Sequence, residues 1–99
     1  MAKVNARGCH EVASLTTERA DVDGVRRRTR LVVRSDGAVL RSDSYWAQYS
    51  DSGYWSGNSL YLFQQRTRED IPQLLTELRN RAAKYENGAS MKVVTRRGI

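Results

Sequence analysis

Hydrophobic and polar residues alternate along most of the chain, and the period changes near the C-terminus. Arg26 to Ser35 and Ala38 to about Gln48 alternate with a period of two, which predicts two strands. The segments from His10 to Arg19 and from Ser59 to Gln65 are rich in β-forming residues and predict two more. From Asp70 to Glu86 the apolar residues recur with a period of 3.6, which predicts an amphipathic helix.

Glycine, asparagine and aspartate mark the ends of these elements. Asp36-Gly37 predicts a two-residue hairpin turn, and Val22-Asp23-Gly24 predicts a three-residue turn with Gly24 in the left-handed conformation. Residues 49–58 read as a loop rich in glycine and serine. Asp70 is the expected N-cap of the helix, with Thr67 as the competing cap and Pro72 in the first turn.

These elements predict an α+β fold, in which an antiparallel sheet of about four strands is followed by one amphipathic helix that covers its apolar face. Met91 to Thr95 can add a short fifth strand. Residues 1–8 are expected to be a flexible arm, 9–95 a single domain and 96–99 a basic tail.

The expected turns also set the register of the strands. A two-residue turn at Asp36-Gly37 pairs Val33 with Leu40 and Arg28 with Tyr45. The preceding turn brings Leu15 opposite Leu31 on the apolar face. The other face is then expected to carry an excess of basic residues around one aromatic ring, namely Arg26, Arg28, Arg30, Arg34, Arg41 and Tyr45.

Composition restricts the class of partner. The 99 residues suffice for one domain, and 17 Lys+Arg against 11 Asp+Glu give a net charge of +6. Such a charge favours polyanions. A single cysteine, Cys9, excludes internal disulfides and cysteine-based zinc sites. Without a long apolar segment, we expect a soluble cytoplasmic protein that needs no membrane, metal or cofactor.

The arginines and aromatic rings together predict binding of single-stranded nucleic acid, because guanidinium groups grip phosphates and flat rings stack on unpaired bases. Tyr54 and Trp55 in the loop are expected to extend the surface formed by the sheet. The candidate binding residues are Arg26, Arg28, Arg30, Arg34, Arg41, Tyr45, Trp46, Tyr54 and Trp55.

The order of features resembles the single-stranded-DNA-binding domain of the transcriptional coactivator positive cofactor four and its bacterial and viral relatives. The resemblance covers roughly residues 27–86 and rests on Val33-Arg34, Gly37, Val39-Leu40, Tyr45-Trp46, Ser59-Leu60 and the helix from Asp70. It implies a strongly curved sheet, a homodimer formed through the 70–86 helix, and a role in transcription or replication. The matching site positions are Arg34, Arg41, Tyr45 and Trp46. The spacing from Gly37 to Tyr45, the proline at the helix start and the strand after the helix depart from the family pattern.

Other functions stay open. Catalysis has little support, because His10 and Cys9 are adjacent and therefore point to opposite sides of a strand. The sheet could bind duplex DNA through arginines on base edges. The Tyr/Trp-rich loop could instead capture a protein, as a small viral factor captures a host protein. The plainest alternative is that the arginine face is only solvated.

Overall fold

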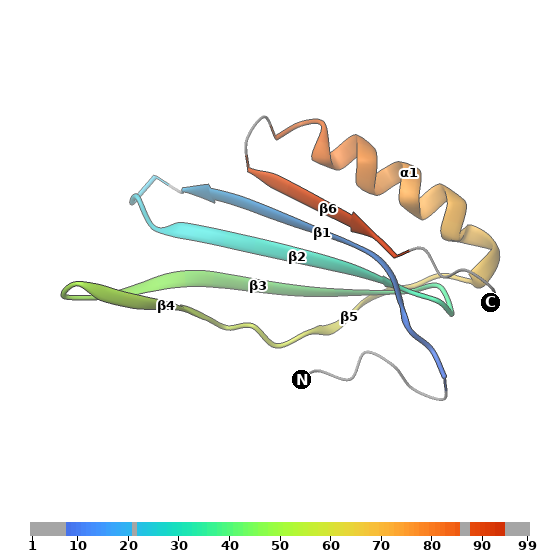
Figure 1. The fold of residues 1–99 in the computed structure, drawn as a ribbon, viewed down its shortest axis with the longest axis horizontal. Coiled ribbons are helices and arrows are strands. Elements are labelled where there is room, and N and C mark those ends of the chain that lie inside the picture. Colours follow the sequence, from blue (N-terminus) through green and yellow to red (C-terminus); the bar gives the residue numbers. More distant parts are fainter. Residues whose placement is uncertain (1–7, 21, 86–87, 95–99) are drawn as a thin grey trace.

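The computed structural model describes residues 8–20, 22–85 and 88–94, which form a six-stranded antiparallel sheet and one α-helix (Figure 1). The elements in chain order are β1 (Glu11–Ala20), β2 (Arg26–Arg34), β3 (Ala38–Tyr49), β4 (Ser52–Ser56), β5 (Tyr61–Gln65), a 3-10 turn (Arg68–Asp70), α1 (Ile71–Ala82) and β6 (Ala89–Val93). The predicted α+β class is confirmed. The expected tail and all but Gly8 of the expected arm lie outside the described residues.

The sheet has the strand order β4-β3-β2-β1-β6, and β5 lies along the same edge of β3 as β4. The long strand β3 has room for both, because β5 pairs with Ala38–Arg41 and β4 pairs with Tyr45–Tyr49. Strand β4 corrects the prediction that residues 49–58 form a loop. Its serine and glycine are poor strand formers, but pairing with β3 and the contact between Trp46 and Trp55 hold the segment in the sheet.

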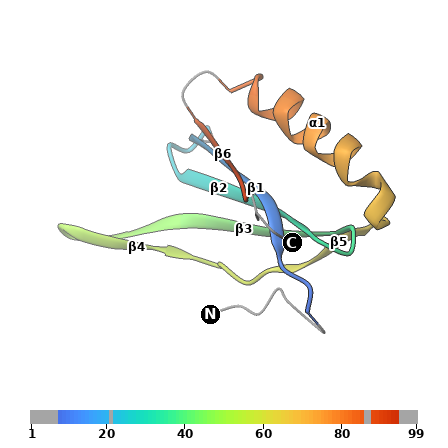
Figure 2. The same ribbon diagram turned by 45° about the vertical axis from the view of Figure 1, so that its right-hand side comes forward.

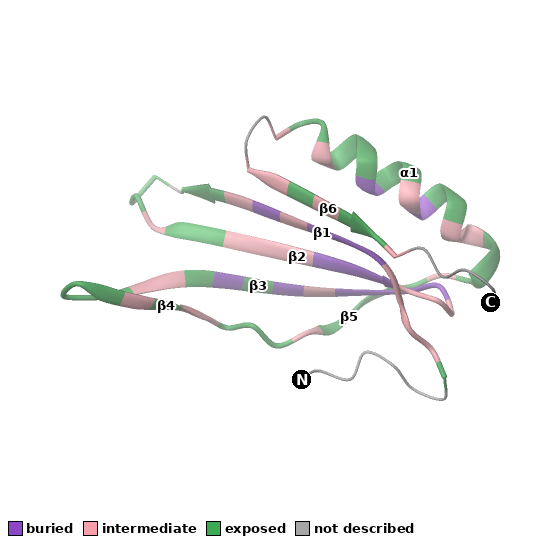
Figure 3. Cartoon of the chain, viewed as in Figure 1, coloured by how far each residue is buried: buried purple, intermediate pink, exposed green. Residues whose placement is uncertain are grey.

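Helix α1 packs on one side of the sheet, over β1 and β6, as Figure 2 shows from a second direction. Its buried residues are Leu74 and Leu78. They join a core formed by Ala13, Leu15, Leu31, Val33 and Val39 (Figure 3). The apolar stripe predicted for the helix is therefore confirmed as far along the chain as Ala82, which packs against this core. The side of the sheet that meets α1 is called the helix face below, and the other side the opposite face.

Each of the two candidate caps precedes a helical element: Asp70 is the N-cap of α1, as expected, and Thr67 is the N-cap of the 3-10 turn before it. The Asp70 carboxylate accepts hydrogen bonds from the Thr67 backbone N–H at 3.2 Å and from its hydroxyl at 3.1 Å. The 3-10 turn then leads into α1, with Pro72 in its first turn as expected. The helix ends at Ala82, earlier than predicted, and β6 begins at Ala89 rather than Met91.

The register between β1 and β2 matches the prediction. Leu15 pairs with Leu31, Ala13 with Val33 and Glu18 with Arg28. Gly24 has a φ of 81°, the left-handed conformation expected of it. The register between β2 and β3 differs by one residue, because Val33 pairs with Val39 and Leu31 with Arg41.

The difference arises from the turn at Gly37, which holds three residues rather than two. The Gly37 N–H donates to the Arg34 carbonyl at 2.9 Å, and Gly37 has a φ of 93°. This is the arrangement in which a β-turn is followed by one left-handed glycine. Asp36 supports it by accepting hydrogen bonds from the Ala38 N–H at 3.1 Å and from the Arg34 guanidinium.

A shift of one residue places every side chain of β3 on the other side of the sheet. Arg41 and Tyr45, expected beside Arg28 and Arg30, therefore lie on the helix face. Trp46, expected on the apolar side, lies on the opposite face instead. The predicted single surface is wrong in this respect, and its members are divided between the two faces.

Gly37 also contacts the segment that leads into the helix. A Cβ atom at this position would lie 2.4 Å from the Thr67 carbonyl carbon, and the Arg66 N–H donates to the Gly37 carbonyl at 3.0 Å. We therefore expect Gly37→Ala to lower the free energy of unfolding by about 2 kcal/mol, through backbone strain and the clash together. Gly24→Ala is the control, because Gly24 has a similar φ and nothing within 4 Å of the added Cβ. Urea denaturation measures the free energy of unfolding of both variants. Equal losses would show that the contact between Gly37 and Thr67 adds nothing to the cost of the substitution.

The ion pair between Arg34 and Asp36 predicts a dependence of stability on pH. A hydrogen bond from Arg34 lowers the pKa of Asp36 to about 2, against the opposing effect of burial; the unfolded value is about 3.9. The contribution is therefore complete above about pH 4 and is lost as the pH falls toward 2.

Because Asp36 is 35% exposed, solvent screening limits this contribution to about 1 kcal/mol. Asp36→Asn should lower the free energy of unfolding by that amount at pH 7, and its stability should approach that of the unchanged protein near pH 2. Urea denaturation at both pH values measures the difference. A difference that is the same at both would show that the charge of Asp36 contributes nothing.

Candidate nucleic-acid interface

The opposite face carries arginines that stack on tryptophans of the same chain. The Arg28 guanidinium lies 4.2 Å from the ring centroid of Trp55, and the Arg26 guanidinium lies 5.4 Å from that of Trp46 and 5.3 Å from that of Trp55. The two indoles meet edge to face with centroids 5.5 Å apart. Gly53 leaves room for this arrangement, because a Cβ there would lie 2.6 Å from the Trp46 ring. The cluster holds the β3–β4 hairpin against β2.

Arginines of the opposite face also have acidic partners of their own. Arg26 pairs with Glu18 at 2.9 Å, and Arg30 pairs with Glu11 at 3.3 Å. Arg34 is bound to Asp36, while Arg28 donates to the Asn58 side chain at 3.3 Å. Much of the positive charge that the sequence places on this face is therefore compensated within the protein.

The helix face is covered over only part of its length. A helix of 12 residues is about 18 Å long, whereas the long dimension of the molecule is 47 Å. Figure 1 shows the β3–β4 hairpin extending past the C-terminal end of α1. The side chains of the helix face beyond that end are polar or aromatic rather than aliphatic: Thr17, Arg19, Arg27, Thr29, Asp43 and Tyr45.

Four arginines from four different elements meet at this end of the helix face. A small cavity of about 100 Å³, called the arginine pocket here, is lined by Arg19 of β1, Arg27 of β2, Arg41 of β3, and by Thr17, Thr29, Arg81 and Tyr85. Arg81 lies in the last turn of α1, and Tyr85 follows three residues after its end. No carboxylate is among the residues that line this pocket, so its surface presents hydrogen-bond donors and positive charge.

The arginine pocket joins two larger cavities. It shares Arg19, Arg27 and Thr29 with an outer cavity of about 390 Å³, which is also lined by Arg28, Asp43, Ser44 and Tyr45. It shares Arg81 and Tyr85 with a helix cavity of about 550 Å³ between α1 and the sheet. The three cavities adjoin one another at these shared residues, and together they are called the arginine groove below.

The charges of this groove are only partly compensated. Arg19 and Arg81 form no ion pair with any carboxylate that the structure describes. Arg41 pairs with Asp43 at 3.0 Å. An anion that enters the groove would therefore meet two guanidinium groups, those of Arg19 and Arg81, that give up no ion pair with a described carboxylate to bind it.

Asp43 fixes the position of several side chains in the groove. It accepts hydrogen bonds from the Thr29 hydroxyl at 2.8 Å, from Arg41 at 3.0 Å and from the Tyr61 hydroxyl at 3.4 Å. Burial opposes its ionisation, but hydrogen bonds from Arg41, Thr29 and Tyr61 outweigh that effect and hold the pKa of Asp43 below its usual value. The carboxylate is thus ionised at neutral pH and orients Arg41, whose guanidinium lies 5.0 Å from the ring centroid of Phe63.

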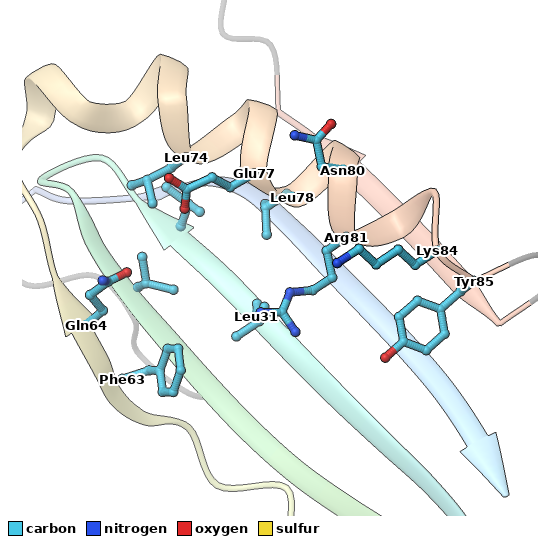
Figure 4. A pocket seen from close by; sticks show the side chains of 12 residues that line it. Leu31, Phe63, Gln64, Leu74, Glu77, Leu78, Asn80, Arg81, Lys84 and Tyr85 are labelled. Atoms are coloured by element: carbon cyan, nitrogen blue, oxygen red, sulfur yellow. The ribbon is translucent and has the colours of Figure 1, made fainter.

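The helix cavity has one apolar and one polar side (Figure 4). Leu31, Leu74 and Leu78 line it beneath the helix, and the Phe63 ring of β5 stands on the far wall. Arg81 extends from α1 toward Leu31 with Tyr85 beside it, as Figure 4 shows. The exposed rings of the groove are Tyr45 and Phe63, at 44% and 46%.

The structure separates the residues that the sequence grouped as one site. Arg41 and Tyr45 lie in the arginine groove, while Arg26, Arg28, Arg30, Trp46 and Trp55 lie on the opposite face. Arg34 forms an ion pair with Asp36 at the turn between β2 and β3. Tyr54 stacks on Tyr49 at the exposed end of the β3–β4 hairpin, with centroids 5.7 Å apart.

Sequence reasoning missed Arg19, Arg27, Arg81 and Tyr85. The register predicted from the sequence already placed Arg27 and Thr29 on the helix face, and this placement could have pointed to the groove. A comparison of helix length with strand length shows that the helix cannot cover those positions.

Comparison with known proteins yields no protein-family model, curated protein or solved structure that matches this chain. Within residues 8–20, 22–85 and 88–94, no helix has the length and apolar character needed to cross a membrane. The same residues contain no group of three histidine, cysteine, aspartate or glutamate side chains placed to hold a metal ion.

The contacts on the opposite face predict a structural contribution from Arg28. A cation–π contact at an exposed site contributes about 0.5–1 kcal/mol, so Arg28→Gln should lower the free energy of unfolding by about that amount. Arg19→Gln removes the same charge from the arginine groove, and we expect it to leave stability unchanged. Thermal and urea denaturation compare the two variants. A larger loss for the Arg19 variant would reverse the assignment of the two faces.

Proposed function

We propose that the protein binds single-stranded nucleic acid in the arginine groove. The observation that carries this proposal is the meeting of Arg19, Arg27, Arg41 and Arg81 in one concave site on the helix face. Guanidinium groups make forked contacts to phosphate oxygens. Phosphate contacts of this kind supply most of the affinity of a nucleic-acid-binding protein that lacks sequence preference.

Aromatic side chains in the same groove support a single strand. Tyr45 borders the outer cavity and Phe63 the helix cavity, and both residues are exposed, at 44% and 46%. Unpaired bases that stack on such rings gain about 1–3 kcal/mol each, whichever base is present. Bases in a duplex are already stacked and present only their edges in the grooves. The groove thus combines the two features that single-strand binders share.

The fold is compatible with the resemblance to positive cofactor four, in which a curved sheet is followed by one helix. Two of the matching positions, Arg41 and Tyr45, lie in the groove, whereas Arg34 and Trp46 do not. A role in transcription or replication and a homodimer through α1 stay predictions. The exposed residues of α1 include Gln73, Thr76 and Arg79, which are polar, so the helix offers no extended apolar surface to a second copy.

A protein partner is the second candidate, and one observation favours it. Tyr49 and Tyr54 form a stacked pair at the end of the β3–β4 hairpin and are 60% and 49% exposed. Exposed tyrosines are frequent in the centres of protein interfaces. A protein-interaction module would use this hairpin and leave the arginine groove empty, so the two functions involve different residues.

The location of binding is tested by two variants with the same change of charge on different faces. Arg19→Gln/Arg81→Gln removes two groups of the groove, and Arg26→Gln/Arg30→Gln removes two from the opposite face that line none of the three cavities. Fluorescence anisotropy of a labelled oligothymidylate at 50 mM and 200 mM salt measures affinity and its salt dependence. We expect the groove variant to lose at least tenfold in affinity and about 1.4 units of the logarithmic salt slope.

The opposite-face variant should bind within about twofold of the unchanged protein, because its arginines already have internal partners. Loss of binding in that variant alone would move the site to the opposite face. Absence of oligonucleotide binding by the unchanged protein would reject the function. A duplex competitor that displaces the probe at least tenfold better than the single strand would replace it with duplex binding.

A further inference from the structure

The arginine pocket and the helix cavity differ in chemistry but share a boundary. The pocket is small and lined by four arginines and two threonines, whereas the cavity is five times larger and partly apolar. Arg81 and Tyr85 belong to both. A ligand that spans the boundary would place an anionic group in the pocket and a partly apolar group in the cavity.

The anionic end of such a ligand is best supplied by a terminal phosphate. A phosphodiester inside a strand has one negative charge, whereas a phosphate monoester has about 1.5 to 2 at pH 7 and three terminal oxygens. Arg19 and Arg81, which form no ion pair with a described carboxylate, carry two positive charges, whereas one phosphodiester supplies a single negative charge. The Thr17 and Thr29 hydroxyls add two further donors at the same place.

The other end fits a nucleobase. The helix cavity of about 550 Å³ lies within the range of sites that hold small molecules. Phe63 offers a ring for stacking, and Leu31, Leu74 and Leu78 line the cavity beneath the helix. Gln64 and Asn80 also line it, and their amides can donate to and accept from the edge of a base.

We propose that the arginine groove contains a seat for one nucleotide with a terminal phosphate, in which the phosphate occupies the arginine pocket and the base lies between Phe63 and α1. This proposal rests on the proposed function and refines it, because it makes the end of a phosphorylated strand the preferred ligand. A free nucleoside monophosphate offers the same chemistry from a second source. Both ligands would occupy the seat, and a strand gains further affinity from the outer cavity.

The test compares probes that differ in one chemical group. Labelled oligothymidylates of eight nucleotides carry a 5′-phosphate, a 3′-phosphate or hydroxyls at both ends, and unlabelled thymidine monophosphate, thymidine and inorganic phosphate serve as competitors. We expect one phosphorylated end to bind at least tenfold more tightly than the hydroxyl-ended strand. Thymidine monophosphate should compete at least tenfold better than thymidine or inorganic phosphate. The advantage of the phosphate should shrink below pH 6, where the monoester gains a proton.

Two arginines of the same helix give a matched pair of variants. Arg81→Gln removes a group of the seat, whereas Arg79→Gln removes an exposed arginine that lines none of the three cavities. The Arg81 variant should lose the tenfold preference for a phosphorylated end, and the Arg79 variant should keep it. Equal affinity for all three strands, or inorganic phosphate competing as well as thymidine monophosphate, would overturn the seat.

The outcomes also separate this proposal from the function on which it rests. Strands that bind tightly, but without regard to their ends, would reject the seat and leave single-strand binding intact. If thymidine monophosphate bound as tightly as the phosphorylated strand and hydroxyl-ended strands did not bind, the seat would stand. The protein would then be a nucleotide binder, and single-strand binding would be rejected.

Discussion

The turn between β2 and β3 determines on which face each residue of β3 lies. Its three residues are fixed by the left-handed Gly37, by the Asp36 side chain that accepts from Arg34 and Ala38, and by the contact of Gly37 with Thr67. A two-residue turn would move Arg41 to the opposite face and Trp46 to the helix face. The arginine groove and the Arg–Trp cluster both require the observed turn, because each contains residues of β3 and of its neighbours.

The division of arginines between the faces gives them different physical roles. On the opposite face, Arg26 and Arg28 stack on indoles, and Arg26 and Arg30 bind carboxylates, so a ligand would compete with internal contacts. In the groove, Arg19 and Arg81 have no ionic partner among the described residues. A charge without such a partner loses less when it binds a ligand. This is why the groove, rather than the opposite face, is the better candidate for a polyanion.

Much of the fold could be predicted from the sequence, because periodicity and turn chemistry act locally. The β1–β2 register followed from Gly24, and the helix stripe followed from Leu74 and Leu78. The register at Gly37 could not be predicted, because Asp-Gly suits both turn lengths and the choice depends on contact with Thr67, a residue distant in sequence. Strand β4 was missed because its pairing with β3 outweighs the low strand propensity of Ser52 and Gly53. Because the register of β3 differs by one residue from the predicted one, the candidate site lies on the helix face. Arg41 and Tyr45 belong to it there, and Trp46 does not.

A titration that reports on both faces at once shows where the ligand binds. In an NMR titration of the ¹⁵N-labelled protein with a 5′-phosphorylated oligothymidylate, we expect the signals of the backbone amides of Thr17, Arg19, Thr29 and Arg81 to shift. The indole N–H groups of Trp46 and Trp55, which are the only tryptophans of the chain and lie on the opposite face, should keep their positions. Shifts centred on the two indoles, with the amides of the groove unchanged, would place the binding site on the opposite face.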